Sequence, residues 1–173
     1  MVCAVYKCPS DSLRDRLNYD PSTGEFRWRE HAFSGPMSKF NGMVAGRRST
    51  NGYWEIGIDR HRHRAHRLAW WFCFGPFPID HEVDHINGDK LDNRICNLRL
   101  ATRAQNMQNR GNRRSNSTGY KGVTFSKSRQ KFIAQIVANG RYYRLGQFAT
   151  AEAAHEAYKS AALKLHGDFA RAA

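Results

Sequence analysis

The chain has 173 residues, with 28 Lys and Arg against 15 Asp and Glu, and a formal net charge of +13. A balance this basic indicates a polyanionic partner and points to nucleic acid. No apolar window is long enough to cross a membrane and no signal peptide is visible, so we expect a cytoplasmic protein of a bacterium or a phage-infected cell, with no membrane association.

Four cysteines occur, and their spacing does not match a zinc finger. Only Cys3 and Cys8 lie close together in the sequence, and no second pair of Cys or His at finger spacing faces them. We interpret all four cysteines, which include Cys73 and Cys96, as reduced thiols.

The first half predicts a short helix, two hairpins and an aromatic helix. Residues 10–17 suit the short helix, and the turn residues from Asp20 to Gly24 divide two alternating segments of a hairpin. Residues 31–50 show little pattern and are predicted to be loop. Residues 52–66 predict a second hairpin. His66 then opens an aromatic helix that ends at Gly75, and we expect His66 to support the site rather than to catalyse.

The run of Arg and His in the second hairpin suggests one function. In a strand, Arg62 and Arg64 share a face, and this face predicts contacts with nucleic-acid phosphates. A solvated basic face is the alternative interpretation.

Residues 83–109 read VDHINGDKLDNRICNLRLATRAQNMQN and carry the clearest chemistry. The pattern predicts strand, loop, strand and a helix capped by Thr102. The Asp84 carboxylate and the Asn106 carbonyl are hard oxygen ligands, which suit Mg²⁺ that keeps several waters and also binds substrate phosphate. His85 can take a proton near neutral pH. Such a set fits phosphodiester hydrolysis with one divalent metal.

The same stretch resembles the HNH, or ββα-metal, nuclease motif of the phage and intron homing endonucleases. The resemblance implies that His85 is the general base, that Asn97 orients it, and that Asp84 and Asn106 bind one divalent metal, Mg²⁺ or alternatively Mn²⁺. Asn106 stands where many family members carry His, which implies modest metal affinity and disfavours zinc. A plain hairpin with Asn and Asp in its turns is the alternative, but it leaves Asp84, His85 and Asn106 unexplained. The regular acidic spacing of a calcium loop is absent.

Residues 110–119 predict a basic, flexible linker. Its Arg113 and Arg114 either are simply solvated or track the DNA backbone, with a minor-groove position as one form of that contact.

Residues 120–173 change character and carry nine basic and three acidic residues. Three strands with an Asn139-Gly140 hairpin turn precede an Ala-rich helix that Thr150 caps and Gly167 ends. The expected inner face of this helix is Ala154, Tyr158, Ala161 and Leu165. A sheet of this kind, with one free basic face, can enter a major groove.

Residues 120–165 resemble the plant Apetala/ERF-type DNA-binding domain in the order of their motifs. The resemblance implies base and backbone contacts from the strands. The candidates are Lys121, Lys127, Arg129, Lys131, Arg141, Tyr143 and Arg144. Thr124 and Ser126 stand where plant members often carry Arg, so the target of the plant domains does not transfer.

We therefore predict an α+β protein with an HNH nuclease domain at residues 1–109, a linker at 110–119 and an Apetala/ERF-type domain at 120–173. The predicted activity is site-specific endonuclease cleavage of double-stranded DNA, in which a monomer nicks one strand and a dimer or a second event gives a double-strand break. No obligate protein partner is evident. The alternatives are a transcriptional regulator with an inactive nuclease scaffold and a restriction-type nuclease; an RNA target suits a groove-reading sheet less well.

Overall fold

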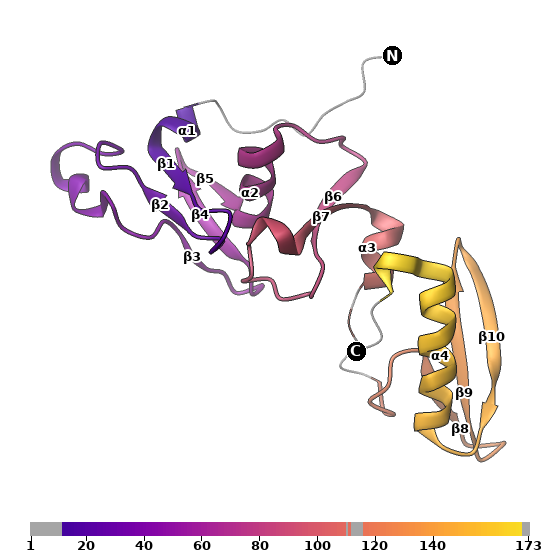
Figure 1. Cartoon of the computed structure of the whole chain (residues 1–173). Coiled ribbons are helices and arrows are strands. Elements are labelled where there is room, and N and C mark those ends of the chain that lie inside the picture. Colours follow the sequence, from indigo (N-terminus) through magenta and orange to yellow (C-terminus); the bar gives the residue numbers. More distant parts are fainter. Residues whose placement is uncertain (1–11, 110, 112–115, 171–173) are drawn as a thin grey trace. The chain divides into compact units, whose positions relative to one another are not determined.

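The computed structural model describes residues 12–109, 111 and 116–170. The chain divides into two compact units, Met1–Thr102 and Arg103–Ala173, and each unit is described by itself. Figure 1 labels their helices and strands. The predicted boundary followed residue 109. The structure instead groups helix α3 (Arg103–Asn109) with the second unit, where it packs against the turn η3 (Gly167–Phe169).

Short antiparallel sheets and one central helix build the first unit. Its elements, in chain order, are α1 (Ser12–Arg16), β1 (Leu17–Tyr19), β2 (Phe26–Trp28), η1 (Gly35–Phe40), β3 (Arg47–Arg48), β4 (Trp54–Ile58), β5 (His61–Arg64), α2 (Ala65–Phe74), β6 (His81–His85), η2 (Ile95–Asn97) and β7 (Leu98–Thr102). The sheets are β1-β2, β3-β4-β5 and β6-β7.

Both predicted hairpins form through their turn residues. Asp20 accepts through Oδ1 from the Ser22 N–H at 2.8 Å, and its carbonyl accepts from Gly24 at the same distance. In the second hairpin Asp59 and Arg60 have φ of 48° and 64°, the two positive φ values that a tight turn between right-twisted strands requires. The predicted loop at residues 31–50 was wrong in part. It contains η1 and β3. The two residues of β3 join a sheet by pairing with the next strand, β4, and no alternation in so short a segment indicates this.

Helix α2 holds the core of the first unit together. Its residues Leu68, Ala69 and Trp71 are buried, and it ends at Gly75, where φ is 81°. Around it pack the largest fully buried side chains of the unit, which are Leu13, Leu17, Phe26, Ile56 and Phe77. Strand β6 follows α2 after a short connection and packs against it. The start of α2, with His66, therefore lies beside the end of β6, with His85 of the predicted nuclease motif.

The second unit contains the predicted three-stranded sheet with a helix on one face. After α3 come β8 (Val123–Ser126), β9 (Lys131–Ala138), β10 (Arg141–Phe148), α4 (Ala151–His166) and η3. The strand order is β10-β9-β8, and Asn139 and Gly140 form the predicted turn with φ of 51° and 73°. Thr150 caps α4 by accepting from the Ala153 N–H at 3.2 Å.

The inner face of α4 differs slightly from the predicted one. Its buried residues are Ala154, Tyr158, Ala162 and His166, which follow one another at i, i+4 spacing. Ala161 is only partly buried and Leu165 is 41% exposed, because the helix buries the following residues, Ala162 and His166, in their place. No helix within the described residues combines the length and apolar character that crossing a membrane requires.

Candidate active site and nucleic-acid interface

Asparagine side chains close the loop between β6 and β7. Asn97 donates from Nδ2 to Asn87 Oδ1 at 3.0 Å and to the Asp92 carbonyl at 2.9 Å. Its own Oδ1 accepts from the Asn87 N–H at 3.1 Å, and its carbonyl accepts from the Ile86 N–H at 2.9 Å. These bonds fix the loop that leaves His85. The orientation of His85 by Asn97, which the resemblance implies, stays a prediction.

His85 ends β6 with a buried ring, and Asn93 lies against it. Nε2 of His85 is 3.3 Å from Oδ1 of Asn93, and both side chains are buried. The Asn93 amide is oriented because its Nδ2 donates to the Leu91 carbonyl at 3.1 Å. An amide oxygen can only accept, so Nε2 of His85 carries the proton. In the neutral ring, the lone pair that can take a proton is then on Nδ1.

The first hairpin of the chain supports Asn93 from behind. Tyr19 Oη donates to the Asn93 carbonyl at 2.7 Å, and the Ile95 N–H donates to the Pro21 carbonyl at 3.1 Å. Gly24 lies so close that a Cβ there would be 2.6 Å from the Asn93 carbonyl carbon. The β1-β2 turn therefore fixes the backbone of the residue that contacts His85.

His66, in the first turn of α2, packs edge-on against His85. The ring centroids are 4.7 Å apart at 66°, and His66 is only 3% exposed. Burial holds the pKa of His66 well below its usual value, and burial also lowers the pKa of His85, where the Asn93 hydrogen bond and nearby carboxylates oppose the shift. Both rings are therefore neutral at neutral pH. Because protonating a buried neutral His costs stability, the first unit loses stability as the pH falls below about 6.5.

Asp84 precedes His85 on β6 and pairs with Arg99. The two residues are opposite each other in the β6-β7 register, and Arg99 Nε and Nη2 lie 3.3 and 3.2 Å from Asp84 Oδ2. Both side chains are largely buried, at 10% and 15% exposed for Asp84 and Arg99. The Arg99 pair thus holds the Asp84 carboxylate at a fixed place on β6, one residue before His85.

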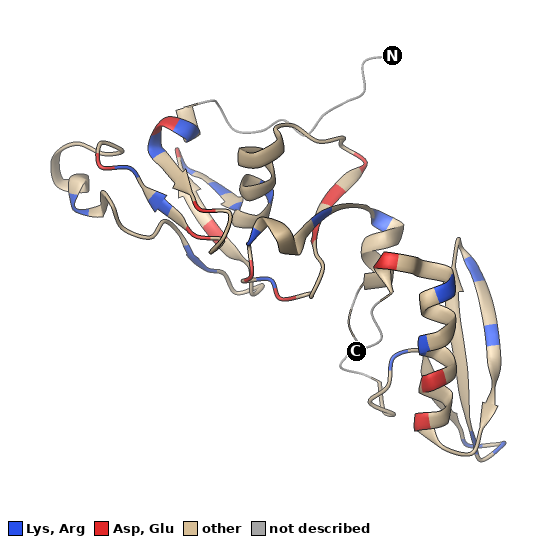
Figure 2. Cartoon of the chain, in the orientation of Figure 1, with Lys and Arg blue, Asp and Glu red and all other residues tan. Residues whose placement is uncertain are grey.

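In the second unit, the strand register decides which side chains lie on the sheet face opposite α4. Val123, Ala134 and Ile136 face α4 and are buried. Arg144 pairs with Gln135, and Lys131 pairs with Ser126, so these residues lie on the opposite, open face. Figure 2 shows Lys and Arg along the edge strand β10. Arg144 and Lys131 thus place part of the predicted basic character on the open face.

Comparison with known proteins now decides the family. A family model described as HNH endonuclease matches residues 63–108, and an AP2 domain model matches residues 118–168. Protein 3.8 of Escherichia phage T7 is 33% identical over 108 residues, which span 62% of this chain and 88% of that protein. This chain belongs to the HNH endonuclease family.

Two further likenesses accompany this one. The HNH endonuclease L560 of Acanthamoeba polyphaga mimivirus is 36% identical over 121 residues, and the match spans 69% of this chain and 62% of that protein. A solved structure on DNA binding and cleavage by the HNH homing endonuclease I-HmuI aligns over 87% of this chain and 85% of that chain, with 21% identity and a TM-score of 0.43.

The donor set of this HNH endonuclease suits a hard cation with few protein ligands. Within the described residues, no group of three or more His, Cys, Asp or Glu could hold a metal ion. Asp84 offers a carboxylate, the ligand that Mg²⁺ takes singly or in pairs while keeping waters and substrate phosphate. Asn106 lies in α3 of the second unit, four residues after β7 ends. Its role as the second ligand therefore stays a prediction.

The AP2 sheet corrects one detail of the predicted interface. Arg141 and Tyr143 pair with Ala138 and Ile136, so the register turns both toward the side that carries α4. Tyr142, which sequence reasoning passed over, lies on the open face and is 79% exposed. The strand has a bulge between Arg144 and Gly146, which shifts its register. The sequence shows that side chains alternate along β10, but only the pairing with β9 shows which of them lie on the open face.

Three side chains gather on the open face near the β8-β9 turn. With its amide oxygen turned to the guanidinium groups, Gln147 accepts from Arg129 Nη1 at 3.1 Å and from Arg144 Nη2 at 2.9 Å. The predicted candidates Lys127, Arg129 and Lys131 are all exposed at this end. The arrangement keeps two guanidinium groups in place for a polyanion.

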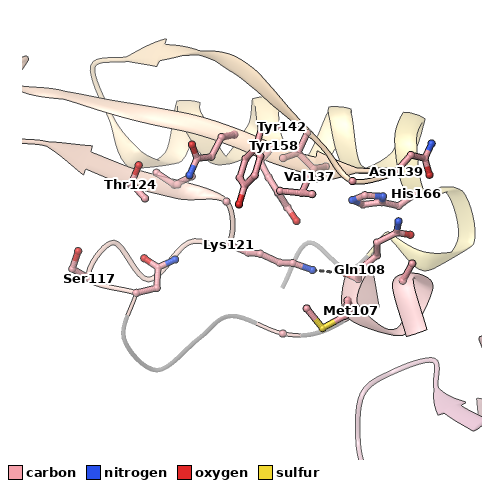
Figure 3. Close-up of a pocket in the computed structure, with 18 residues that line it drawn as sticks. Met107, Gln108, Ser117, Lys121, Thr124, Val137, Asn139, Tyr142, Tyr158 and His166 are labelled. Atoms are coloured by element: carbon pink, nitrogen blue, oxygen red, sulfur yellow. Dashed lines mark hydrogen bonds between the residues drawn. The ribbon is translucent and has the colours of Figure 1, made fainter. Parts of the chain in front are cut away.

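Lys121, another predicted DNA contact, is used inside the second unit. Its Nζ donates to the Gln108 carbonyl at 2.6 Å, at the end of α3, and lies 6.0 Å from the Tyr158 ring. Figure 3 shows Lys121 pointing into a cavity of about 690 Å³ toward Gln108, with Met107 and His166 also lining it. Lys121 therefore holds α3 to the AP2 unit, and its assignment to DNA loses its geometric support.

The remaining predicted contacts divide between described and undescribed residues. Arg62 and Arg64 are exposed on β5 and share a face of the β3-β4-β5 sheet, as predicted. Arg113 and Arg114, like Cys3 and Cys8, lie outside the described residues. Cys73 and Cys96 are free and exposed.

Asn93 is the residue of the site that sequence reasoning missed. In the sequence it is one of several Asn and Asp residues of a turn-rich loop, where turn formation explains its presence. The sequence shows only that it lies eight residues after His85, and this spacing has no helical or strand periodicity. Its role follows from the folded loop, which brings its amide to Nε2 of His85.

Replacing Asn93 with alanine is expected to lower the single-turnover cleavage rate by about 10- to 100-fold, because a small misplacement of a reacting group costs up to about 10²-fold. DNA affinity should stay within about twofold, since Asn93 is buried and faces His85. Asn93→Asp keeps an oxygen acceptor and should retain more activity than Asn93→Ala.

Tyr19→Phe tests the support of Asn93 from behind. It removes the hydrogen bond to the Asn93 backbone but leaves the Asn93 amide in place, so the rate should fall by less than in Asn93→Ala. Equal cleavage rates for wild type and Asn93→Ala would show that Asn93 does not position His85.

Proposed function

We propose that this HNH endonuclease cuts double-stranded DNA at a specific site, with the AP2 unit selecting the site and the β6-β7 motif cutting one strand. The observation that carries the proposal is the buried pair of His85 and Asn93, which leaves the basic nitrogen of a neutral imidazole on Nδ1. A fixed tautomer of this kind suits a general base, because it keeps one ring nitrogen able to take a proton.

In the proposed reaction His85 acts on water. Nδ1 takes a proton from the water while its oxygen forms a bond to phosphorus, and the bond from phosphorus to the 3′ oxygen breaks. The 3′ oxygen takes a proton from solvent, so the products are a 5′-phosphate and a 3′-hydroxyl. The imidazolium returns its proton to solvent after release.

Asp84, with Asn106 as the second ligand that the resemblance implies, would hold one divalent ion, for which Mg²⁺ is our proposal. When bound, this ion supplies positive charge to the scissile phosphate and the departing oxygen. Arg99 keeps the Asp84 carboxylate in position for this role.

One such site acts on one strand at a time. We therefore propose that a monomer nicks DNA and that a double-strand break needs a second copy or a second event. Site selection by the AP2 unit together with a single cutting site suits a homing endonuclease, which cuts an allele that lacks its own gene. The proposed working place is the cytoplasm of a bacterium or a phage-infected cell.

Cleavage of end-labelled duplex DNA from the neighbourhood of the gene, with and without Mg²⁺, tests the proposal. We expect a discrete, Mg²⁺-dependent cut in one strand at low protein concentration. Footprinting on the same DNA should show protection around the cut. If the DNA is protected but not cut at any Mg²⁺ concentration, the protein is a DNA-binding regulator with an inactive nuclease scaffold. If cuts occur at all sequences, the protein is a nuclease without site specificity.

A further inference from the structure

Tyr53 lies close to the catalytic histidine and to two cationic side chains of the first unit. Its ring centroid is 6.3 Å from that of His85 and 5.2 Å from that of His66. The Arg64 guanidinium carbon is 4.4 Å from the Tyr53 centroid, and the Lys90 ammonium nitrogen is 4.3 Å from it. Two cations thus share one ring, directly beside the site.

Separate elements fix these three side chains in place. Tyr53 immediately precedes β4, Arg64 ends β5, and Lys90 comes from the motif loop. The Lys90 ammonium also donates to the Asn51 carbonyl at 3.0 Å, which ties the motif loop to the turn before Tyr53. The cluster is therefore built from the folded unit and is not a chance meeting of long side chains on one helix.

The charge of this cluster is not neutralised, unlike that of the other cations around the motif. Arg94 pairs with Asp92 at 2.7 Å, and Arg99 pairs with Asp84 at 3.2 Å. Arg64 and Lys90 form no ion pair with any acidic side chain among the described residues, and both are exposed.

Two like charges held at one ring repel each other, and attraction to the ring face relieves only part of this repulsion. An anion that both cations can reach removes the rest. The backbone of DNA presents such an anion at every nucleotide, and exposed Lys and Arg are its usual contacts.

We propose that Tyr53, Arg64 and Lys90 form a phosphate seat that binds a backbone phosphate of the cleaved strand next to the scissile one. Both seat cations lie at the Tyr53 ring, whose centroid is 6.3 Å from that of His85, so the phosphate in the seat is a neighbour of the one that water attacks. The seat positions the strand and reads no base. This proposal rests on the proposed function, since it needs DNA at the His85 site.

The first test compares two doubly substituted full-length proteins that lose the same charge. Arg64→Gln/Lys90→Gln removes the seat cations, and Lys39→Gln/Lys164→Gln removes two exposed cations that do not belong to the seat. Binding of a fluorescent 40-base-pair duplex without divalent metal is measured by anisotropy against NaCl concentration. The seat variant should lower the slope of log K against log[salt] by about 1 to 2, and the control should leave the slope near that of wild type.

The second test locates the phosphate. After the wild-type cut is mapped, duplexes with a single methylphosphonate at each flanking phosphate are cleaved under single-turnover conditions. One neutralised phosphate should slow wild type by about tenfold and should not slow the seat variant further, whereas both proteins should respond alike at all other phosphates. Tyr53→Phe, which keeps the ring, should behave as wild type, and Tyr53→Leu should behave as the seat variant.

The outcomes separate the seat from the proposed function. If wild type cuts but the seat variant keeps the wild-type salt slope, or remains as sensitive as wild type to every methylphosphonate, the seat is overturned and the nuclease stands. If wild type cuts no DNA, the proposed function fails, and the salt slope alone decides whether Arg64 and Lys90 bind the backbone. Thermal unfolding of each variant shows whether a change reflects a loss of folding, and Tyr53→Phe behaving as Tyr53→Leu also contradicts the seat.

Discussion

His85→Ala is expected to lower the single-turnover rate of DNA cleavage by about 10²- to 10⁴-fold, the usual contribution of a positioned general base. The ring is buried and lies beside Asn93 and His66, so it contributes little surface for DNA contact. The dissociation constant for the same duplex, measured without divalent metal, should therefore change by less than about threefold. A separation of rate from affinity distinguishes a base from a residue that only supports the DNA-binding surface.

His81→Ala is the matched control for this experiment. His81 begins the same strand and is partly buried, but its Nδ1 faces the exposed Asp80 at 2.9 Å rather than an oriented amide. The cleavage rate of this variant should stay near that of wild type. Similar losses for His81→Ala and His85→Ala, or an equal loss of rate and affinity in His85→Ala, would show that the assignment of the base is wrong.

Much of the fold could be predicted because its elements depend on local chemistry. The Asp20–Gly24 turn, the Asn139-Gly140 turn and the Thr150 cap each need only a few neighbouring residues, and each forms as expected. The β6-β7 hairpin and the start of α3 also follow from turn-forming residues and from the alternation of apolar side chains. Such features depend little on the rest of the chain.

The features that sequence reasoning missed depend on strand register and on the folded course of loops, which residue types alone do not reveal. Two-residue β3 exists only through its register with β4, and Tyr142 rather than Tyr143 lies on the open face because of its partner on β9. The Asn93 amide reaches His85 only when the loop is folded, and Lys121 reaches Gln108 only when the second unit is folded. A basic residue in a DNA-binding sequence can equally hold a helix in place, and only the contact tells the two roles apart.

The Asp84–Arg99 pair has the same origin and a larger functional consequence. The resemblance names Asp84 as a ligand, but the sequence does not show that a guanidinium group lies opposite it in the register. A buried carboxylate without a partner is costly, and Arg99 supplies that partner to Asp84 in its largely buried place. Replacing one partner therefore affects folding as well as chemistry, and a test must separate the two.

Asp84→Asn is expected to lower the cleavage rate at fixed Mg²⁺ by about 100-fold or more, since the charge that a bound ion supplies at the phosphate is worth several kcal/mol. The amide keeps the shape of the carboxylate and an oxygen for Arg99, so the fold should survive. Raising the Mg²⁺ or Mn²⁺ concentration should restore part of the rate, because Asn still offers one neutral oxygen. The measurement is the single-turnover rate as a function of metal concentration.

Asp80→Asn supplies the control, because this exposed carboxylate immediately precedes the same strand and pairs with His81. Its rate should follow the wild-type dependence on Mg²⁺. Thermal unfolding without metal, compared between Asp84→Asn and wild type, then separates a weakened Arg99 contact from a lost ligand. An Asp84→Asn protein that cuts at the wild-type rate, with the wild-type dependence on Mg²⁺, would remove Asp84 from the metal site and leave it as the partner of Arg99 alone.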